Sequence, residues 1–571
     1  MKKQYKIIII LIIVLIIICG VFVLINNSES KDTGVSYNTT ALSEKLTIDM
    51  DNWNYDEDND IYYQMGLVYC LNPEDENYES CGIYVPGKYF DGVKNSNGKY
   101  TCTINENNKI KNYTAMSAPI VMPVDTPGYL SCKAPTKFSG KSISEYSDAG
   151  FIYLDAGCRG RDNGEAPEGI CDLKSAVTYY RFNGDVLPGD NEKIFTFGHS
   201  GGGAQSAIMG ASGNSELYNP YLESIGAAMV DKEGNSLSNA IYGSMCWCPI
   251  TNLDTADAAY EWNMGQYTRE NNTFEGELSK DLSNEYVNYV NNLKLKDPNG
   301  NTLTLDNVSS GSYYDYLLNV TEESLNNFLN DTTFPYIQSN RDLNKISDEN
   351  IEMKNMHGDD STTYKTAKDY IDSLNSDEKW IEYNSSSNTA KITSIEAFIK
   401  NCKNPTKQIP AFDDFNRTQS ENELFGISSN SSLHFDSIVS DLLTNNSDKY
   451  SKYNDYSSDY QKDFSDDLNE VDSQNNTIKT RENMYNLMYY LNDYYNASTS
   501  SDVAKYWRIN TGIEQGDTSQ CVDINLYLGV LNKVGSDNVE FSIVWGQGHI
   551  KAERTGNSTS NFINWVNSCL N

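Results

Sequence analysis

Positive charge is scarce in this chain, and so is histidine. The 571 residues include 79 Asp and Glu against 44 Lys and Arg, a formal net charge of −35, and only 4 His. A nucleic-acid-binding face needs clustered Lys and Arg to neutralise phosphates, so this balance argues against a nucleic-acid partner. Wholesale disorder is excluded as well, because 39% of the residues are apolar and can form a packed core.

Long hydrophobic runs are limited to one, from Ile7 to Ile25. At about 1.5 Å per residue this run spans roughly 29 Å, close to the hydrocarbon core of a bilayer. Three lysines precede it and favour a cytoplasmic N-terminus, and no small-residue cleavage site follows it. We therefore predict a cytoplasmic segment over 1–6, a transmembrane anchor over 7–25 and a polar linker over 26–55, with an extracellular catalytic part at the cell membrane. Cleavage of residues 1–25 as a signal would instead give a secreted protein.

Cysteine spacing typical of zinc sites is absent too. Cys246 and Cys248 have one residue between them, whereas a zinc knuckle has two to four. We therefore predict neither a metal nor a cofactor. All but one of the 12 cysteines follow the hydrophobic run, and an exported chain can oxidise them. The pairs close enough in sequence to bridge are Cys70/Cys81, Cys102/Cys132 and Cys158/Cys171.

Strand-like apolar runs alternate with helix-length segments over much of the chain. The runs lie at 83–85, 119–123, 151–157, 193–200 and 241–250, and the pattern resumes at 506–512 and 539–549. Such buried runs indicate a mainly parallel sheet of the α/β class. The intervening part is rich in Asn, Ser, Asp and Tyr with helical stretches, and is too long for a loop. We predict an α/β core over 56–250 and 501–571, interrupted by a mostly helical lid over 251–500.

A G-x-S-x-G motif, residues 198–202, directly follows one of these strands and opens a helix of small residues. This is the context of a nucleophile elbow, in which glycines let the strand turn sharply and hold Ser200 on an exposed, strained corner. At the helix N-terminus, the Gly201 N–H and the helix dipole can stabilise an oxyanion. The segment 119–131 is the candidate source of a second donor, from Gly128 or Tyr129.

Four histidines leave few candidates for a general base. His199 lies inside the elbow, where such a ring points away from the Ser200 hydroxyl, and His357 and His434 lie in the polar insertion. His549 follows the last strand, which gives the chain order of nucleophile, acid and base in α/β-hydrolases. We therefore predict His549 as the base.

Four separated patches together resemble one known family. They are GHSGGGAQSAIMGASGNSELYNPYLESIGA, MCWCPITNLDTADAAYEWN, KQIPAFDDFNRTQSENELFG and WRINTGIEQGDTS…VWGQGH. In this order, over roughly residues 60–571, they look like bacterial subtype B tannases and their esterase relatives. The resemblance implies an α/β-hydrolase with a large lid that cleaves galloyl or related phenolic esters. It also implies that Lys407 and Glu421 match the lid residues that hold galloyl hydroxyls, since Lys can donate to a phenol oxygen and Glu can accept its proton.

The chain departs from this family at the acid of the triad. The family pattern is D-x-D-T, with the triad acid first and a galloyl contact second; aligned here, Gln515 takes the first position and Asp517 the second. Either Asp517 or Glu514 orients His549, or the acid is lost, because a neutral amide cannot stabilise the imidazolium. We predict Asp517 as the acid.

The leading interpretation is a membrane-anchored extracellular serine esterase that hydrolyses small phenolic esters through an acyl-enzyme on Ser200. A broad carboxylesterase or a peptidase on the same fold is one alternative, since fold and elbow do not select the leaving group. A hydrolase relative that binds ligands without turning them over is the other, and Gln515 is the feature that favours it.

Overall fold

The computed structural model describes residues 38–339 and 361–571, apart from 404, 406, 498 and 499. The predicted cytoplasmic segment, the predicted anchor and residues 26–37 of the predicted linker lie outside this part of the chain. Within it, no helix combines the length and apolarity needed to cross a bilayer.

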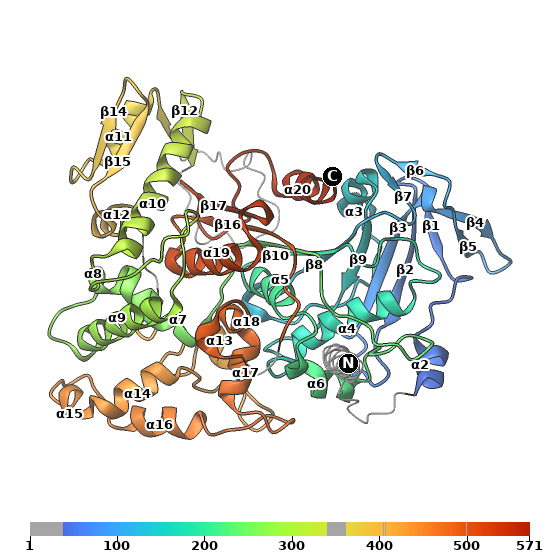
Figure 1. The fold of residues 1–571 in the computed structure, drawn as a ribbon, viewed down its shortest axis with the longest axis horizontal. Helices are drawn as coiled ribbons and strands as arrows, with labels where there is room; N and C mark the ends of the chain where they lie inside the picture. The colour runs from blue at the N-terminus through green and yellow to red at the C-terminus, as the bar shows by residue number, and fades with distance from the viewer. Residues whose placement is uncertain (1–37, 340–360, 404, 406, 498–499) are drawn as a thin grey trace, which may run out of the picture.

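A nine-stranded mixed sheet forms the centre of the molecule (Figure 1). Its spatial order is β1-β2-β3-β9-β8-β10-β11-β16-β17. The strands from β9 to β17 are parallel, whereas β1, β2 and β3 pair antiparallel with their neighbours. The strands are β1 (Asn54–Asp56), β2 (Ile61–Val68), β3 (Ser80–Pro86), β8 (Ile120–Val124), β9 (Ile152–Ala156), β10 (Ile194–His199), β11 (Gly243–Trp247), β16 (Tyr506–Gly512) and β17 (Val539–Val544), with outer hairpins β4 (Phe90–Lys94)–β5 (Tyr100–Ile104) and β6 (Lys109–Ile110)–β7 (Tyr113–Thr114).

Helices cover both faces of the sheet, as successive side chains of β10 illustrate. Thr196 points to one face, where its hydroxyl lies 2.8 Å from that of Ser206 on α5. Phe197 points to the other, where its ring centroid lies 4.3 Å from that of Phe562 on α20. This alternation is the period of a strand buried on both sides. The core helices are α2 (Thr39–Leu46), α3 (Gly140–Ala149), α4 (Glu168–Phe182), α5 (Gly201–Ala211), α6 (Asn219–Ile225), α19 (Gln520–Val534) and α20 (Ser558–Leu570).

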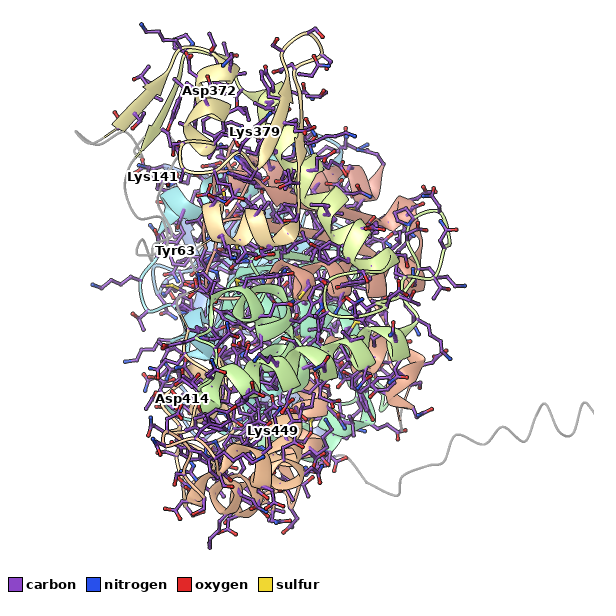
Figure 2. The ribbon with its side chains drawn as sticks, turned by 90° about the vertical axis from the view of Figure 1, so that its left-hand side faces the viewer. Tyr63, Lys141, Asp372, Lys379, Asp414 and Lys449 are labelled. Atoms are coloured by element: carbon purple, nitrogen blue, oxygen red, sulfur yellow. The ribbon has the colours of Figure 1, made fainter. Side chains whose placement is uncertain are left out.

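The large insertion lies between β11 and β16, and Figure 1 shows it in green to orange at one side of the sheet. Its helices are α7 (Leu253–Tyr260), α8 (Gln266–Thr268), α9 (Phe274–Leu293), α10 (Ser312–Asp331), α11 (Ala367–Leu374), α12 (Ile395–Cys402), α13 (Ser420–Leu424), α14 (Ser437–Asn445), α15 (Ser447–Tyr450), α16 (Asp459–Asp467), α17 (Ile478–Tyr485) and α18 (Leu487–Leu491). Figure 2 views this side from outside, with Asp372 and Lys379 at one end and Asp414 and Lys449 at the other.

The described part of the insertion contains two short antiparallel strand pairs that the sequence patterns did not predict. They pair β12 (Tyr336–Ser339) with β13 (Ser361–Tyr364), and β14 (Ile381–Asn384) with β15 (Thr389–Ile392). Strands of four residues with largely exposed polar side chains lack the apolar signal that marks a buried strand. Within its described residues, the insertion is therefore mostly helical with two small antiparallel strand pairs.

The folded part of the chain begins earlier than the predicted linker boundary at residue 55. Helix α2 occupies part of that linker, and its Leu42 and Leu46 are buried. Trp53 is fully buried as well and packs edge-on against Phe90. These few apolar side chains sit in a polar stretch, so composition alone did not separate them from a tether.

The three cysteine pairs considered from the sequence do not form disulfides. Cys70, Cys81, Cys102, Cys158 and Cys171 are all buried thiols. The strand register explains the first pair. Cys81 lies within β3 opposite Leu67, whereas Cys70 follows the end of β2, where its backbone pairs with that of Ala227.

Candidate active site

Ser200 occupies the sharp turn between β10 and α5. Its φ of 58° and ψ of −124° place it in the strained backbone region expected for a nucleophile elbow. Gly198 and Gly202 are required there, because a Cβ on Gly198 would lie 2.3 Å from the Gly202 carbonyl oxygen, and one on Gly202 would lie 2.1 Å from that of Val124. The close approach of backbone at both positions thus fixes the serine at the carboxyl edge of the sheet.

His549 approaches this serine from the loop after β17. Its Nε2 lies 2.8 Å from the Ser200 Oγ, within hydrogen-bond distance. Burial lowers the pKa of His549 and Lys407 lowers it further, while Asp517 opposes them. The imidazole is therefore neutral at pH 7, and its lone pair can accept the serine proton.

Gln515, rather than an acid, forms the hydrogen bond to the second nitrogen of His549. The Gln515 Oε1 lies 2.6 Å from the Nδ1, whereas the nearest Asp517 oxygen lies 3.9 Å from it. Glu514 turns toward Cys402, whose Sγ lies 3.9 Å from its Oε1, and burial raises the pKa of Glu514 to about 7. The predicted contact between Asp517 and His549 is thus electrostatic, without a hydrogen bond. The turn after β16 places the Gln515 amide, and not the Asp517 carboxylate, against the Nδ1 of the ring.

The Gln515 amide also fixes the tautomer of His549. Its Nε2 donates to the Thr511 hydroxyl oxygen at 2.5 Å, and its amide oxygen faces the histidine. The Nδ1 then carries the proton, and the Nε2 presents its lone pair to Ser200. A neutral amide therefore provides the orientation that a triad carboxylate would provide, but not its charge.

The two predicted oxyanion donors lie beside the elbow. The turn η2 (Pro127–Tyr129) approaches Gly201 so closely that a Cβ there would lie 2.5 Å from the Tyr129 nitrogen and 3.1 Å from that of Gly128. Tyr129 already donates its N–H to the Thr126 carbonyl at 3.0 Å. Of Gly128 and Tyr129, Gly128 is therefore the better candidate for the second oxyanion donor. Arg161 holds the turn, since its Nε donates to the Gly128 carbonyl at 2.7 Å.

A buried arginine supports the segment behind this turn. Arg159 is 2% exposed and makes a bidentate contact with Asp172, with N···O distances of 3.0 and 2.9 Å. The next residue, Gly160, packs against the backbone of residues 129–131. The Arg159–Asp172 contact thus holds in place the segment that packs against the oxyanion turn.

Replacing Arg159 by Met is expected to lower the free energy of unfolding by about 3–5 kcal/mol, because it leaves the Asp172 carboxylate buried without its partner. Lys232→Met is the matched control: Lys232 pairs with Asp185 at 2.7 Å on the surface, and its loss should cost less than about 1 kcal/mol. Denaturant unfolding measures both. Equal losses would mean that the Arg159 cluster is no more important than a surface pair.

Lys407 and Glu421 come together in the insertion, next to the oxyanion turn. The Lys407 Nζ lies 4.0 Å from the Glu421 Oε2 and 4.1 Å from the centroid of the Phe412 ring. Glu421 is buried on α13, and its Oε2 has no hydrogen-bond partner. The residue before it, Ser420, has its hydroxyl 3.5 Å from the position of a Cβ on Gly128. The pair therefore borders the same site as the elbow.

The remaining histidines lie in different places. His434 is buried in the insertion with its Nδ1 2.6 Å from Asp413, and His357 lies outside the described residues. His199 follows the expectation that it leaves the serine hydroxyl free, but its ring lies beside His549, with centroids 4.8 Å apart. The resemblance had placed Gln515 at the position of the triad acid without predicting its hydrogen bond to His549, and no sequence signal placed His199 and Cys248 together.

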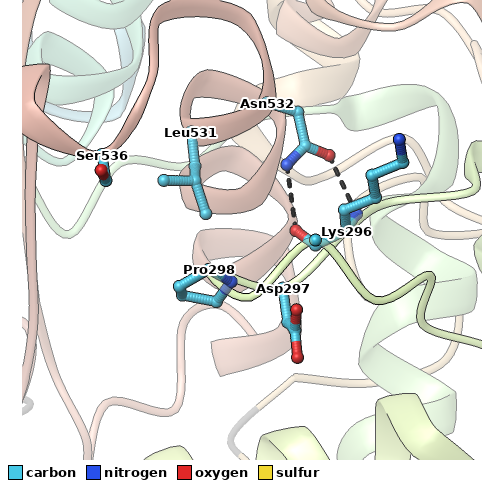
Figure 3. A pocket seen from close by; sticks show the side chains of 7 residues that line it. Lys296, Asp297, Pro298, Leu531, Asn532 and Ser536 are labelled. Atoms are coloured by element: carbon cyan, nitrogen blue, oxygen red, sulfur yellow. Dashed lines mark hydrogen bonds between the residues drawn. The ribbon is translucent and has the colours of Figure 1, made fainter.

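A surface hollow of about 310 Å³ lies elsewhere, between the loop after α9 and the end of α19 (Figure 3). Asn532 bridges its wall, accepting from the Lys296 N–H at 2.9 Å and donating to the Lys296 carbonyl at 3.0 Å. Its lining carries no histidine. The hydrogen bonds close a loop onto a helix, so this hollow does not compete with the elbow as a reaction site.

Comparison with known proteins agrees with this geometry. A family model described as BD-FAE matches residues 110–291. The tannase of Fusobacterium nucleatum is 27% identical with a TM-score of 0.66, and the match covers 92% of this chain and 99% of that one. Tannin acyl hydrolase from Lactobacillus plantarum is 24% identical with a TM-score of 0.66, over 93% and 100% of the two chains. A tannin acyl hydrolase in complex with ethyl gallate matches over the same shares, with 24% identity and a TM-score of 0.65. No curated protein matches the chain.

A strained serine at the carboxyl edge of a mostly parallel sheet, met by a histidine from the loop after the last strand, defines an α/β-hydrolase. Within that class, residues 110–291 match the BD-FAE family model, and the chain is similar over most of its length to solved tannases.

Proposed function

We propose that the protein is a serine esterase that hydrolyses galloyl or related phenolic esters. The observation that carries this proposal is the 2.8 Å contact between the Ser200 Oγ and the His549 Nε2 at a strained elbow. Ser200 attacks the ester carbonyl while His549 takes its proton and then passes it to the leaving alcohol. The N–H groups of Gly128 and Gly201 stabilise the oxyanion, and water hydrolyses the acyl-enzyme.

The roles of the triad acid are divided in this proposal. Gln515 holds the productive tautomer of His549 through its 2.6 Å contact, while Asp517, at 3.9 Å, supplies negative charge to the imidazolium. A Coulomb interaction at this distance is worth about 4 kcal/mol at an effective dielectric of 20, and less where solvent reaches it. Asp517 is 37% exposed, so its support is weaker than that of a buried acid.

Lys407 and Glu421 are the proposed contacts for the phenol. The buried Glu421 Oε2, which has no hydrogen bond, is suited to accept a phenolic proton, and the neighbouring ammonium is suited to donate to the phenol oxygen. The related enzyme that binds ethyl gallate supports the choice of a phenolic ester as the substrate class.

Substituting either member of this pair tests the assignment. Lys407→Met and Glu421→Gln are each expected to raise KM for methyl gallate by about 10- to 100-fold, because a hydrogen bond to a charged group is worth about 1.5–3 kcal/mol. KM for p-nitrophenyl acetate should change less than about twofold, because its acetyl group carries no phenolic hydroxyl for the pair to bind. Lys449→Met, a lysine of the same insertion paired with Asp281, is the control. Equal changes with both substrates would contradict a phenol-binding role.

The second candidate function is a ligand-binding hydrolase relative, and the neutral Gln515 favours it. A fluorophosphonate probe with Ser200→Ala as control separates the two functions. Labelling of the wild type and hydrolysis of methyl gallate, methyl ferulate or p-nitrophenyl acetate support an esterase. Labelling no stronger than that of Ser200→Ala rejects it.

We also propose that residues 7–25 anchor the enzyme in the cell membrane, with the catalytic part outside. The apolar run and its preceding lysines support this topology. An anchored protein should stay in the membrane fraction after alkaline carbonate washing, and release into the wash would contradict the anchor.

A further inference from the structure

Three side chains with metal-binding atoms converge at the carboxyl edge of the sheet. His199 ends β10, Cys248 directly follows β11, and His549 lies in the loop after β17. One ligand atom of each lies within 4.8 Å of the other two. Two imidazoles and a thiol are ligands that Zn²⁺ and similar thiophilic cations prefer.

The His199 ring has a nitrogen available for such an ion. Its Nε2 is shielded from solvent and has no hydrogen-bond partner. Burial lowers the pKa of His199 well below its usual value, and a hydrogen bond with the His549 backbone opposes this only in part. A buried acceptor without a donor is costly, and a metal ion would satisfy it.

Cys248 lies where its sulfur can complete the set. Its backbone has a φ of 44°, and its Sγ lies 3.2 Å from the Ile550 carbonyl oxygen and accepts from the Gly512 N–H at 3.4 Å. Burial raises the pKa of this thiol to about 12, so it is protonated without a metal. An N–H aimed at the sulfur stabilises the thiolate that forms when a metal displaces the proton.

We propose that His199, Cys248 and His549 bind a divalent cation of the zinc class, and that this binding switches off the esterase. Tetrahedral metal–ligand bonds of about 2.0–2.3 Å require ligand atoms roughly 3.3–3.8 Å apart. Side-chain rotations that move the ligand atoms by about 1 Å would bring them to these separations. The Cys248 thiol releases its proton to solvent as the metal–sulfur bond forms, and water completes the coordination.

Capture of either ring nitrogen removes His549 as the base. A metal on the Nε2 replaces the hydrogen bond to Ser200. A metal on the Nδ1 displaces Gln515 and leaves the proton on the Nε2, which then cannot accept from the serine. The inhibitory consequence rests on the proposed esterase function, whereas metal binding itself does not.

Cobalt(II) is the spectroscopic probe that tests the site on the full chain. Chelator-treated protein titrated with Co²⁺ is expected to develop a sulfur-to-cobalt charge-transfer band that saturates at one equivalent. The band should be lost in Cys248→Ser and retained in Cys246→Ser, a buried cysteine of the same segment whose Sγ lies 3.4 Å from the Ser244 hydroxyl. His199→Asn should weaken Co²⁺ binding at least about tenfold. No band in the wild type, or a band kept in Cys248→Ser, overturns the proposal.

Zinc inhibition tests the regulatory step separately. Zn²⁺ should lower the wild-type rate and fluorophosphonate labelling, and a chelator should restore both. With each variant compared to its own metal-free rate, Cys248→Ser should need at least about tenfold more Zn²⁺ for half-inhibition, and Cys246→Ser the wild-type amount. A cobalt band in a protein without esterase activity would reject the proposed function but keep the metal site. Zinc inhibition that is identical in Cys248→Ser and the wild type would reject inhibition through this site.

Discussion

The Ser200→Ala and His549→Ala variants are each expected to lose about 10⁶-fold in kcat, and the double variant is expected to lose no more. The reason is the 2.8 Å hydrogen bond between the two side chains. Without the base, the hydroxyl is a weak nucleophile; without the hydroxyl, the base has nothing to activate. Each single substitution therefore removes the whole proton-transfer unit, while the oxyanion donors keep a residual rate over water.

Pre-steady-state and steady-state hydrolysis of p-nitrophenyl acetate by the three variants measures this coupling. Ser142→Ala, an exposed serine on α3, is the matched control and should keep the wild-type rate. Losses that multiply in the double variant would show that the two residues act independently. A Ser200→Ala variant that still gives a burst of product would mean that the nucleophile is another residue.

Sequence patterns predicted the parts of this site that are local or follow chain order. The elbow is a contiguous motif after an apolar strand, and His549 is the histidine that follows the last strand. Both could therefore be predicted from the sequence. The sheet was accessible for the same reason, since its parallel strands are continuous apolar runs. Short polar hairpins such as β14–β15 were not, because their stability comes from packing on the helices around them.

Other features depend on distances that no pattern encodes. Asp517 was the predicted histidine partner because it is the acid that remains where the family has D-x-D, but the turn after β16 brings the Gln515 amide, at the position of the family's triad acid, within 2.6 Å and leaves Asp517 at 3.9 Å. Cys248 was judged by its spacing from Cys246, whereas its neighbours in space are two histidines from distant strand ends. A cluster drawn from the ends of three strands and the loops that follow them has no sequence spacing to recognise.

Gln515→Glu is expected to raise kcat/KM by roughly 5- to 30-fold, because it adds charge without changing the shape of the contact. The Thr511 hydroxyl can reverse its role and donate to the new carboxylate, and the His549 Nδ1 keeps its acceptor. A charge-assisted hydrogen bond is worth about 1–2 kcal/mol more than a neutral one, which sets the size of the gain. Gln515→Met, of similar length but without an acceptor, should instead lose about 10²- to 10³-fold, since nothing then holds the productive tautomer.

The pH profile of these variants separates charge from orientation. His549 accepts a proton only when neutral, so kcat/KM rises with pH through its pKa, which burial holds below the usual 6.5 in the wild type. The new carboxylate of Gln515→Glu favours the imidazolium, so the acid limb should move to higher pH while the plateau rises. In Gln515→Met the charge is unchanged, so the limb should stay while the plateau falls. Measured with a chelator present, a Gln515→Glu variant no faster than the wild type would mean that the amide already provides all that the triad needs from this position.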